Sequence, residues 1–415
     1  MRRVVIIYIL TSVTAVVSFV AVLVLKSSLA ASPFAIGPHT LALFIPPVAA
    51  VGIVSACVWL GSTGARYVLL SFLVLVVSFL PLTSLIREPI VYHKGDDVVR
   101  YDTYARNMIE NRTVWGGDAL LHEGQNHYVD QPGYRYFLAA TMVVTGRANR
   151  GMQVLHLFLY WITVAVFLTV VSPRLSLTFR RGLALFAFLS SPFAAKAVLL
   201  GIGEWVAVVF VLWSITAFVC ALYRIAVLLM ALVPFFRQNM FVAAGLMVLL
   251  FVLISSKKWW VRGVNGILGI LVLLLPLWHN IFYADEVRLL VTNTAVPFDY
   301  TWKNAGDIVV RILERSLHYL GFSFESGSFS QMIIGTLFAP LGTFLVILSV
   351  IHLSGMARII AVVLVLSVIV PTLILGWAYF PRFEYLNLWF LIASFVMFIS
   401  FIEKKTESSL ILNNA

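Results

Sequence analysis

Long apolar runs, separated by short polar turns, make up most of the chain. A helix of about 20 residues crosses the hydrocarbon core of a bilayer, and many of the runs have that length or slightly less. Because a segment in lipid must satisfy its own backbone hydrogen bonds, each run is expected to form an α-helix. The predicted spans are 4–25, 41–60, 67–86, 152–171, 182–200, 205–222, 225–236, 240–255, 264–282, 333–353, 359–377 and 385–401.

The fold class predicted from this pattern is an all-α polytopic membrane protein with about twelve transmembrane helices, within a range of roughly 10–13. A single transmembrane domain, 1–415, carries a first polar loop at 87–150 and a second at 283–331. The chain is 61% hydrophobic and 11% charged, which is more apolar surface than a soluble protein of this length can bury. Strands of a membrane barrel would be about half as long and would alternate in polarity.

Both long loops contain segments with helical periodicity. The segments 98–111 and 307–320 each carry their apolar residues on one face, as amphipathic helices do. The segment 133–146 is largely apolar but, at about 14 residues, is too short to cross a bilayer. We therefore expect helices that lie beside the membrane in both loops.

The net charge of +11 is explained by membrane topology. With the N-terminus in the cytoplasm and one crossing for each span, the cytoplasmic side holds thirteen of the 29 basic residues but only two acidic ones, Glu403 and Glu407. Sixteen basic and sixteen acidic residues are left for the outer side. Short loops rich in Lys and Arg are typical of the cytoplasmic face, so the excess charge indicates orientation and no nucleic-acid partner. The thirteen are Arg2, Arg3, Arg66, Arg174, Arg180, Arg181, Arg224, Lys257, Lys258, Arg262, Arg358, Lys404 and Lys405.

These features predict a multi-pass protein of a bacterial inner membrane, with both termini cytoplasmic and both long loops periplasmic. The apolar run that begins the chain is too long for a signal peptide, so we expect it to be retained as a helix. Cys57 and Cys220 lie inside apolar runs and have the spacing of neither a disulfide framework nor a metal site.

The first polar loop carries the candidate chemistry. Asp96 and Asp97 follow directly after the third span. An outer face has no supply of ATP or nucleotide sugars, and the chain lacks the glycine-rich loops that bind them, so a lipid-linked sugar phosphate is the expected activated substrate. A carboxylate at the membrane edge can take the proton from an attacking acceptor in an inverting transfer. The alternative is that the aspartate caps the following helix.

The same loop resembles a known family. The stretches DDVVRYDTYARNM, QPGYRYFLAATMVVTG and ANRGMQVL, together with Tyr128, are similar to the GT-C glycosyltransferases of the protein O-mannosyltransferase and aminoarabinose-transferase type. The late segment Arg382-Phe383-Glu384-Tyr385 is similar to the aromatic-rich segment before that family's late helix. The chain differs in having an Asp-Asp pair, an additional early span and no soluble periplasmic domain. The matching positions are Asp97, Tyr101, Ala105-Arg106-Asn107-Met108, Pro132-Gly133-Tyr134, Gly146 and Arg150.

The resemblance implies an inverting glycosyltransferase. Its donor would be a polyprenyl-phosphate sugar, such as an undecaprenyl-phosphate sugar, and its acceptor a glycan, lipid or protein of the cell envelope. Asp97 or Asp96 would be the catalytic base. The leaving phosphate needs cationic or hydrogen-bonding partners, and the candidates are Arg237, Arg382, Lys196, Arg135 and His127. The candidate substrate-binding residues are Tyr101, Tyr128, Tyr134, Glu204 and Glu384.

Several of these residues have a structural alternative. Arg237 lies at a break between two short apolar runs, where a charge in lipid is costly, and it could pair with Glu204 instead of binding phosphate. Arg382 could anchor its helix at the interface. No cofactor is expected, although Asp97, Asp130 and His127 offer the ligand types of a divalent metal site at loose spacing.

Two other functions fit the general layout. An O-antigen or capsule polymerase also handles lipid-linked glycans with about ten to twelve spans and large outer loops, but it would not need the Asp-x-x-x-Tyr and Pro-Gly-aromatic motifs. A lipid or glycan flippase, which is not an enzyme, would be expected to show inverted repeats and paired charges deep in its spans. Membrane lipids are partners in all three cases.

Overall fold

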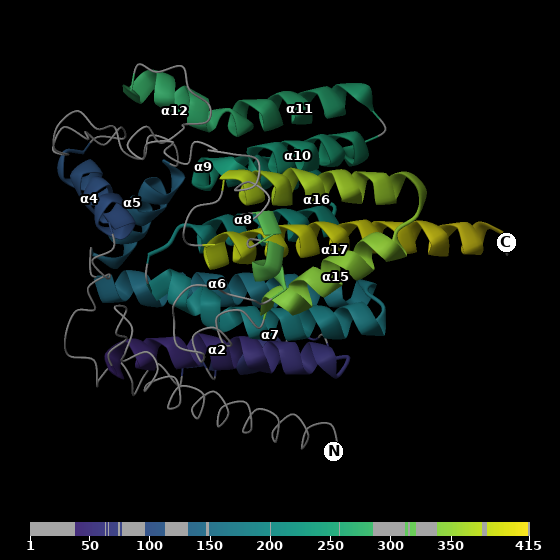
Figure 1. The fold of residues 1–415 in the computed structure, drawn as a ribbon, viewed down its shortest axis with the longest axis horizontal. Coiled ribbons are helices and arrows are strands. Elements are labelled where there is room, and N and C mark those ends of the chain that lie inside the picture. Colours follow the sequence, from purple (N-terminus) through teal and green to yellow (C-terminus); the bar gives the residue numbers. More distant parts are fainter. Residues whose placement is uncertain are drawn as a thin grey trace.

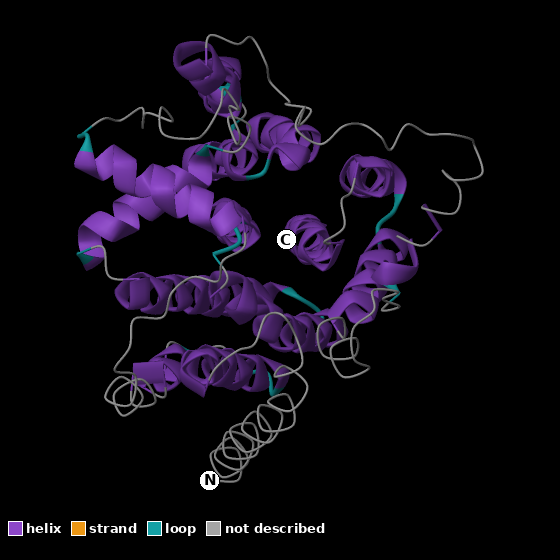
Figure 2. Cartoon of the chain, turned by 60° about the vertical axis from the view of Figure 1, so that its left-hand side comes forward, coloured by secondary structure: helices purple, strands orange, loops and turns teal. Residues whose placement is uncertain are grey.

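Every described element of regular structure is a helix (Figure 2). The computed structural model describes residues 38–62, 64, 66–73, 75–76, 96–112, 132–146, 149–199, 201–256, 258–284, 312–313, 316–320, 338–375 and 380–413. The all-α part of the predicted fold class is therefore confirmed for these residues. The predicted spans 4–25 and 67–86 lie wholly or largely outside them.

The helix bounds follow the predicted apolar runs closely. The helices are α2 (Pro38–Trp59), α4 (Asp96–Glu110), α5 (Gly133–Thr145), α6 (Asn149–Val171), α7 (Leu177–Leu199), α8 (Glu204–Val219), α9 (Tyr223–Phe236), α10 (Phe241–Ser255), α11 (Trp259–Leu273), α12 (Leu275–Ala284), α15 (Phe338–His352), α16 (Gly355–Leu375) and α17 (Phe380–Asn413), with 3-10 turns η1 (Ser172–Arg174) and η2 (Gln238–Met240).

Successive helices from α6 to α11 and from α15 to α17 run antiparallel in one bundle, with α4 and α5 lying together at one end of it (Figure 1). The short turns after α6, α8, α10 and α15 all lie at the opposite end, near the C-terminus (Figure 1). We call these the α4 end and the C-terminal end. Alternation of this kind brings residues that are distant in sequence to the same end of the bundle.

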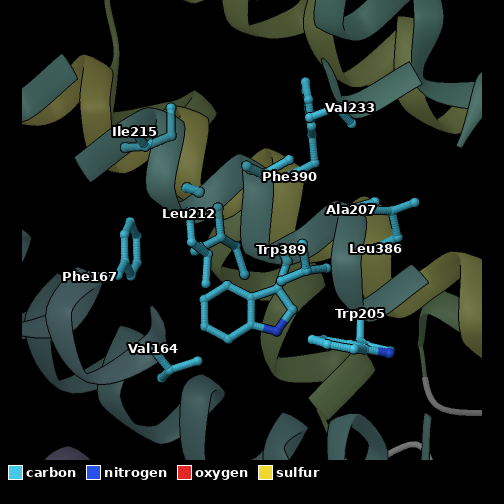
Figure 3. Close-up of a cluster of buried hydrophobic side chains, with 14 of the residues drawn as sticks. Val164, Phe167, Trp205, Ala207, Leu212, Ile215, Val233, Leu386, Trp389 and Phe390 are labelled. Carbon is cyan, nitrogen blue, oxygen red and sulfur yellow. The ribbon is translucent and has the colours of Figure 1, made fainter. Parts of the chain in front are cut away.

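The long helix α17 forms the centre of the bundle. Every residue from 384 to 400 is buried, and a helix that is apolar all round must be covered on every side. Trp389 packs against Phe186 of α7 and Phe167 of α6, with ring centroids 4.9 Å and 6.2 Å away. Figure 3 shows Trp389 and Trp205 within the same apolar cluster.

Three described helices are long and apolar enough to cross a membrane: Gly151–Arg174, Gln238–Ser255 and Gly355–Leu373. The pair formed by α11 and α12 would add a fourth if it counts as one span. Five shorter apolar helices accompany them: Pro46–Trp59, Glu204–Val219, Tyr223–Phe236, Phe338–His352 and Glu384–Ser400.

The two largest differences from the sequence prediction are a bend and an extension. The run 264–282 is divided between α11 and α12, which are bent by 46°. Pro276 lies just after the break, and its ring lacks the N–H that would continue the helical hydrogen bonds and clashes with the preceding turn. The second difference is at the C-terminus, where the backbone of α17 stays helical to Asn413 beyond the predicted span end at 401.

Basic side chains close the turns at the C-terminal end. Arg174 donates from Nη1 to the carbonyl of Val219, the last residue of α8, at 2.7 Å. Arg358 donates to the carbonyl oxygens of Leu353 and Ile351 at 2.6 Å and 2.9 Å. Cations near helix C-termini offset the negative end of the helix dipole. The basic turns that the sequence groups together thus lie at one end of the bundle.

We predict that Gly342→Ala weakens the packing between three helices. A Cβ atom at Gly342 of α15 would lie 2.8 Å from Phe186 of α7 and 2.9 Å from Leu388 of α17. Overpacking of this kind costs on the order of 1–3 kcal/mol. Thermal unfolding of the purified protein in detergent should show a lower Tm.

The matched control is Gly263→Ala in α11, where an added Cβ would meet nothing within 4 Å. It should leave Tm unchanged or raise it, because alanine is the better helix former by about 1 kcal/mol. Equal Tm values for the two variants would contradict the tight packing at Gly342.

Candidate functional site

Buried charged, imidazole and amide side chains are concentrated at the α4 end of the bundle. They come from the first residues of α5 and α8, from the first eight residues of α6 and of α17, from the residue after α9, from α12 and from the segment 316–320. Polar groups inside a membrane bundle are costly and usually functional. This polar floor, as we call it, consists of Arg135, Gln153, His156, Glu204, Arg237, His279, Asn280, His318, Glu384 and Asn387.

Helix α4 lies on α5 through a narrow stripe of its surface. Tyr101, Tyr104 and Met108 of α4 are buried, and the Tyr101 ring meets the Tyr134 ring of α5 edge-on, with centroids 5.1 Å apart. Residues at this spacing share one face of a helix. The outer side of α4 instead carries Glu110, which is exposed.

The register of α4 separates the two adjacent aspartates. At 3.6 residues per turn, position 97 lies about 30° from the middle of the buried stripe, whereas position 96 lies about 130° away. Position 96 shares its side of the helix with Thr103 and Asn107, which are half-buried. The side chains of Asp96 and Asp97 themselves lie outside what the structure describes. The backbone register therefore favours Asp97 as the residue on the α5 side.

Arg135 of α5 lies against the same stripe of α4. Its side chain is fully buried, and its guanidinium carbon lies 4.3 Å from the centre of the Tyr104 ring. A cation over the face of an aromatic ring at this distance is stabilised by the ring quadrupole. A buried cation thus lies against the stripe at Tyr104. The position of Asp97 is about two turns from Tyr104, roughly 10 Å along α4.

The first turn of α5 is held closely by two bundle helices. A Cβ atom at Gly133 would lie 2.7 Å from the backbone oxygen of Phe235 near the end of α9, so only glycine fits there without a shift. On the other side, Gly203, which precedes α8, contacts the Tyr134 ring: a Cβ atom there would lie 3.3 Å from Tyr134 Cγ.

Glu204 and Arg237 form a buried ion pair between those same two helices. Glu204 is the first residue of α8 and is fully buried. Arg237 follows the last residue of α9, where the backbone becomes extended before η2. A carboxylate at a helix N-terminus and a cation at a C-terminus are each favoured by the helix dipole. From the sequence, Arg237 could either bind phosphate or pair with Glu204, and in the structure it pairs with Glu204.

A second polar cluster joins the segment 316–320 to α16 and α17. The amide nitrogen of Asn387 donates to Tyr319 Oη and to Thr372 Oγ1, each at 2.8 Å. His318 Nδ1 lies 3.9 Å from Glu384 Oε1. Burial raises the pKa of the Tyr319 phenol above its ordinary value, so its hydroxyl stays neutral and can accept the bond from Asn387.

Two further imidazoles belong to the polar floor. His279 of α12 lies 3.1 Å from Tyr136 Oη of α5 through Nε2, and His156 of α6 lies 3.1 Å from Thr141 Oγ1 of α5. Sequence reasoning missed both, and it missed His318 and Asn387 as well. The signal was present, because His156, His279 and Asn387 interrupt apolar runs, and polar residues in such runs usually face the bundle interior.

The structure brings together six of the twelve sequence-predicted site residues at the α4 end. Tyr101, Tyr134 and Arg135 lie between α4 and α5, Glu204 pairs with Arg237, and Glu384 begins the buried part of α17. Lys196 and Arg382 lie in α7 and α17, but their side chains, like those of Asp96 and Asp97, are outside the described part. His127 and Tyr128 lie outside the described residues.

Among the described residues, no three His, Cys, Asp or Glu side chains lie close enough together to hold a metal ion. His127 and Asp130, two of the residues considered for a divalent cation, lie outside the described ranges.

Comparison with models of protein families, with curated proteins and with solved structures gives no match to this chain. The residues of the site therefore carry the functional argument.

We predict that the two members of the buried ion pair are strongly coupled. Glu204→Gln or Arg237→Met alone leaves an uncompensated buried charge, which costs about 3–5 kcal/mol. The double variant should lose much less than the sum of the two single losses. Urea unfolding of the protein in mixed micelles measures the coupling by a double-mutant cycle.

The control is the half-buried pair of Arg106 and Asp102 in α4, which are 2.8 Å apart and 32% and 23% exposed. Asp102→Asn should change stability by about 0–1 kcal/mol. Additive losses at Glu204 and Arg237 would show that the two charges do not depend on each other.

Proposed function

We propose that the protein is an integral-membrane glycosyltransferase of the GT-C type. It transfers a sugar, with inversion, from a polyprenyl-phosphate donor to a glycan, lipid or protein acceptor at the outer face of a bacterial inner membrane. In this proposal the chain crosses the membrane about twelve times, with both termini in the cytoplasm and the α4 end on the periplasmic side.

The observation that supports this function best is the position of an acid-headed helix over a buried polar floor. Asp97 is in the first turn of α4, on the register of the buried residues Tyr101 and Tyr104. Arg135 is buried against Tyr104 on the same stripe. Sugar transfer from a lipid-linked phosphate needs two such groups: a base at the acceptor hydroxyl and a cation at the phosphate.

In the proposed reaction, Asp97 accepts the proton of the acceptor hydroxyl as its oxygen attacks the anomeric carbon. The bond between that carbon and the phosphate oxygen breaks, and its electron pair leaves with the polyprenyl phosphate. One carboxylate is enough for this inverting step because the leaving phosphate needs no proton. Charge that develops on the phosphate is stabilised best by donors already in place before the reaction.

Arg135 is our first choice for the phosphate contact, since a buried guanidinium is a strong bidentate partner for phosphate oxygens. Arg382, Lys196 and His127 are further proposed contacts. Tyr101, Tyr128, Tyr134 and Glu384 are proposed to line the sugar and acceptor sites. Glu204 and Arg237 form an ion pair with each other, so neither is proposed as a substrate contact.

We predict that Asp97→Asn abolishes transfer while leaving donor binding largely intact. Loss of a general base lowers the rate by roughly 10²–10⁴-fold. The assay follows release of polyprenyl phosphate and a sugar-sized mass increase on the acceptor, in proteoliposomes supplied with a panel of undecaprenyl-phosphate sugars.

Asp96→Asn and Asp102→Asn are the matched controls on the same helix, and both should keep most of the activity. Full transfer by Asp97→Asn would contradict the proposed mechanism. A product ladder of lengthened glycans would favour a polymerase, and movement of the lipid without phosphate release would favour a flippase.

The proposed orientation predicts opposite labelling of two cysteines. Native Cys220 is exposed at the C-terminal end of the bundle, whereas Cys57 is buried. Glu110→Cys would place a thiol on the exposed side of α4. In intact spheroplasts an impermeant maleimide should label Glu110→Cys in a Cys220→Ser background but leave Cys220 unlabelled in the parent protein until the membrane is opened. The reverse pattern would place the site in the cytoplasm.

A further inference from the structure

We propose that the buried Glu204–Arg237 ion pair is a positioning device for the catalytic carboxylate. The pair ties the start of α8 to the end of α9, and both of these ends lie next to residues that contact the first turn of α5. Helix α5 carries α4, and α4 carries Asp97. The catalytic meaning of this role rests on the proposed function, whereas the mechanical part can be measured without it.

The first two residues of α5 contact residues next to the ion pair. Its first residue, Gly133, lies against the backbone oxygen of Phe235, two residues before Arg237. Its second residue, Tyr134, lies against Gly203, the residue directly before Glu204. These two contacts of the start of α5 are therefore each next to one member of the ion pair.

Helix α5 contacts α4 through the rings of Tyr101 and Tyr104. Tyr134 meets Tyr101 edge-on with centroids 5.1 Å apart, and the following residue, Arg135, lies under Tyr104 at 4.3 Å. Asp97 precedes Tyr101 by one helical turn, about 6 Å along the axis. A shift of α5 is thereby passed to the position of Asp97 through two ring contacts.

The ion pair joins two helix ends that backbone hydrogen bonds do not connect. The start of α8 and the end of α9 are separated in sequence by the whole length of both helices, and the backbone of α9 turns extended at Arg237. Backbone hydrogen bonds of the helices cannot tie these two ends to each other. A buried ion pair adds little net stability compared with apolar packing, and in some proteins its role is instead to specify one arrangement of the groups that it joins. We assign that role to this pair.

The pair differs in this respect from a phosphate-binding site. Arg237 is buried against a fully buried carboxylate at a helix N-terminus, so its charge is already compensated. A donor phosphate at Arg237 would have to compete with Glu204. For a group that acts by position, loss of either partner has the same consequence, and loss of the second adds nothing.

The experiment compares Glu204→Gln, Arg237→Gln and their double variant in nanodiscs, using the same proteoliposome donors and acceptor to measure kcat and KM. A displacement of about 1 Å can reduce turnover about 10²-fold. We expect each single variant to lower kcat by about that factor with little change in donor KM, and the double variant to equal the singles. Glu204→Asp, which keeps the charge, should recover part of kcat.

Distances are measured on the same variants between nitroxides placed at Glu110 of α4 and Leu222, which are both exposed. The distance distribution should be narrow in the parent protein and in Asp102→Asn, and should broaden or shift in Glu204→Gln. Gly133→Ala, which disturbs the seat of α5 without changing a charge, should have the same two effects.

The two readouts separate the possible failures. An unchanged distance distribution in Glu204→Gln and Gly133→Ala would overturn the positioning role, whatever happens to activity. A donor KM that rises only in Arg237→Gln would overturn it too, in favour of direct phosphate contact. If no variant and no parent protein transfers sugar while the distances respond as expected, the mechanical inference stands and the proposed function fails.

Discussion

The high free energy of a charge buried in an apolar helix bundle is the constraint on which this structure depends. Glu204, Arg135 and Glu384 are all fully buried, and each is costly unless a partner or a function compensates it. The described bundle meets this constraint by keeping such groups at the end that carries α4. The core around Trp389 consists of apolar rings and aliphatic side chains (Figure 3), and the opposite end uses arginines that cap backbone carbonyls.

This division gives the two ends different physical tasks. At the C-terminal end, arginines offset the helix dipoles and suit the cytoplasmic face of a membrane. At the α4 end, α4 covers a polar floor through a stripe that includes Tyr101 and Tyr104. Because α17 is buried on all sides from 384 to 400, it provides a rigid support from which Glu384 and Asn387 reach that floor. In the proposed enzyme, a rigid support of this kind would hold a reacting group within the small tolerance that catalysis requires.

Much of the fold could be predicted from the sequence because its main signal, the apolar run, is also the main physical requirement of the fold. The bounds of α6, α8 and α9 agree with the predicted runs to within a few residues. The bend between α11 and α12 was missed even though Pro276 marks it, because the runs on either side have the summed length of one span. A helix that is apolar throughout can be recognised without knowing its neighbours, but the angle between two halves depends on them.

The candidate site was harder to predict, for a different reason. The pairing of Glu204 with Arg237 was one of two alternatives that the sequence allowed, and the structure shows the pair formed where the start of α8 meets the end of α9. The links from Asn387 to Tyr319 and from His279 to Tyr136 join segments that are distant in sequence, so spacing alone could not suggest them. The choice between Asp96 and Asp97 needed the buried side of α4 to be known, which the pairing of α4 with α5 supplies.

The most direct measurement is a high-resolution structure of the protein in nanodiscs that contain undecaprenyl phosphate. We expect phosphate density at the α4 end, bonded to Arg135 or a neighbouring cation, with the Asp97 carboxyl directed toward the same polar floor and the Glu204–Arg237 pair intact. Phosphate bound at the C-terminal end, or an Asp97 side chain turned away from the polar floor, would contradict it.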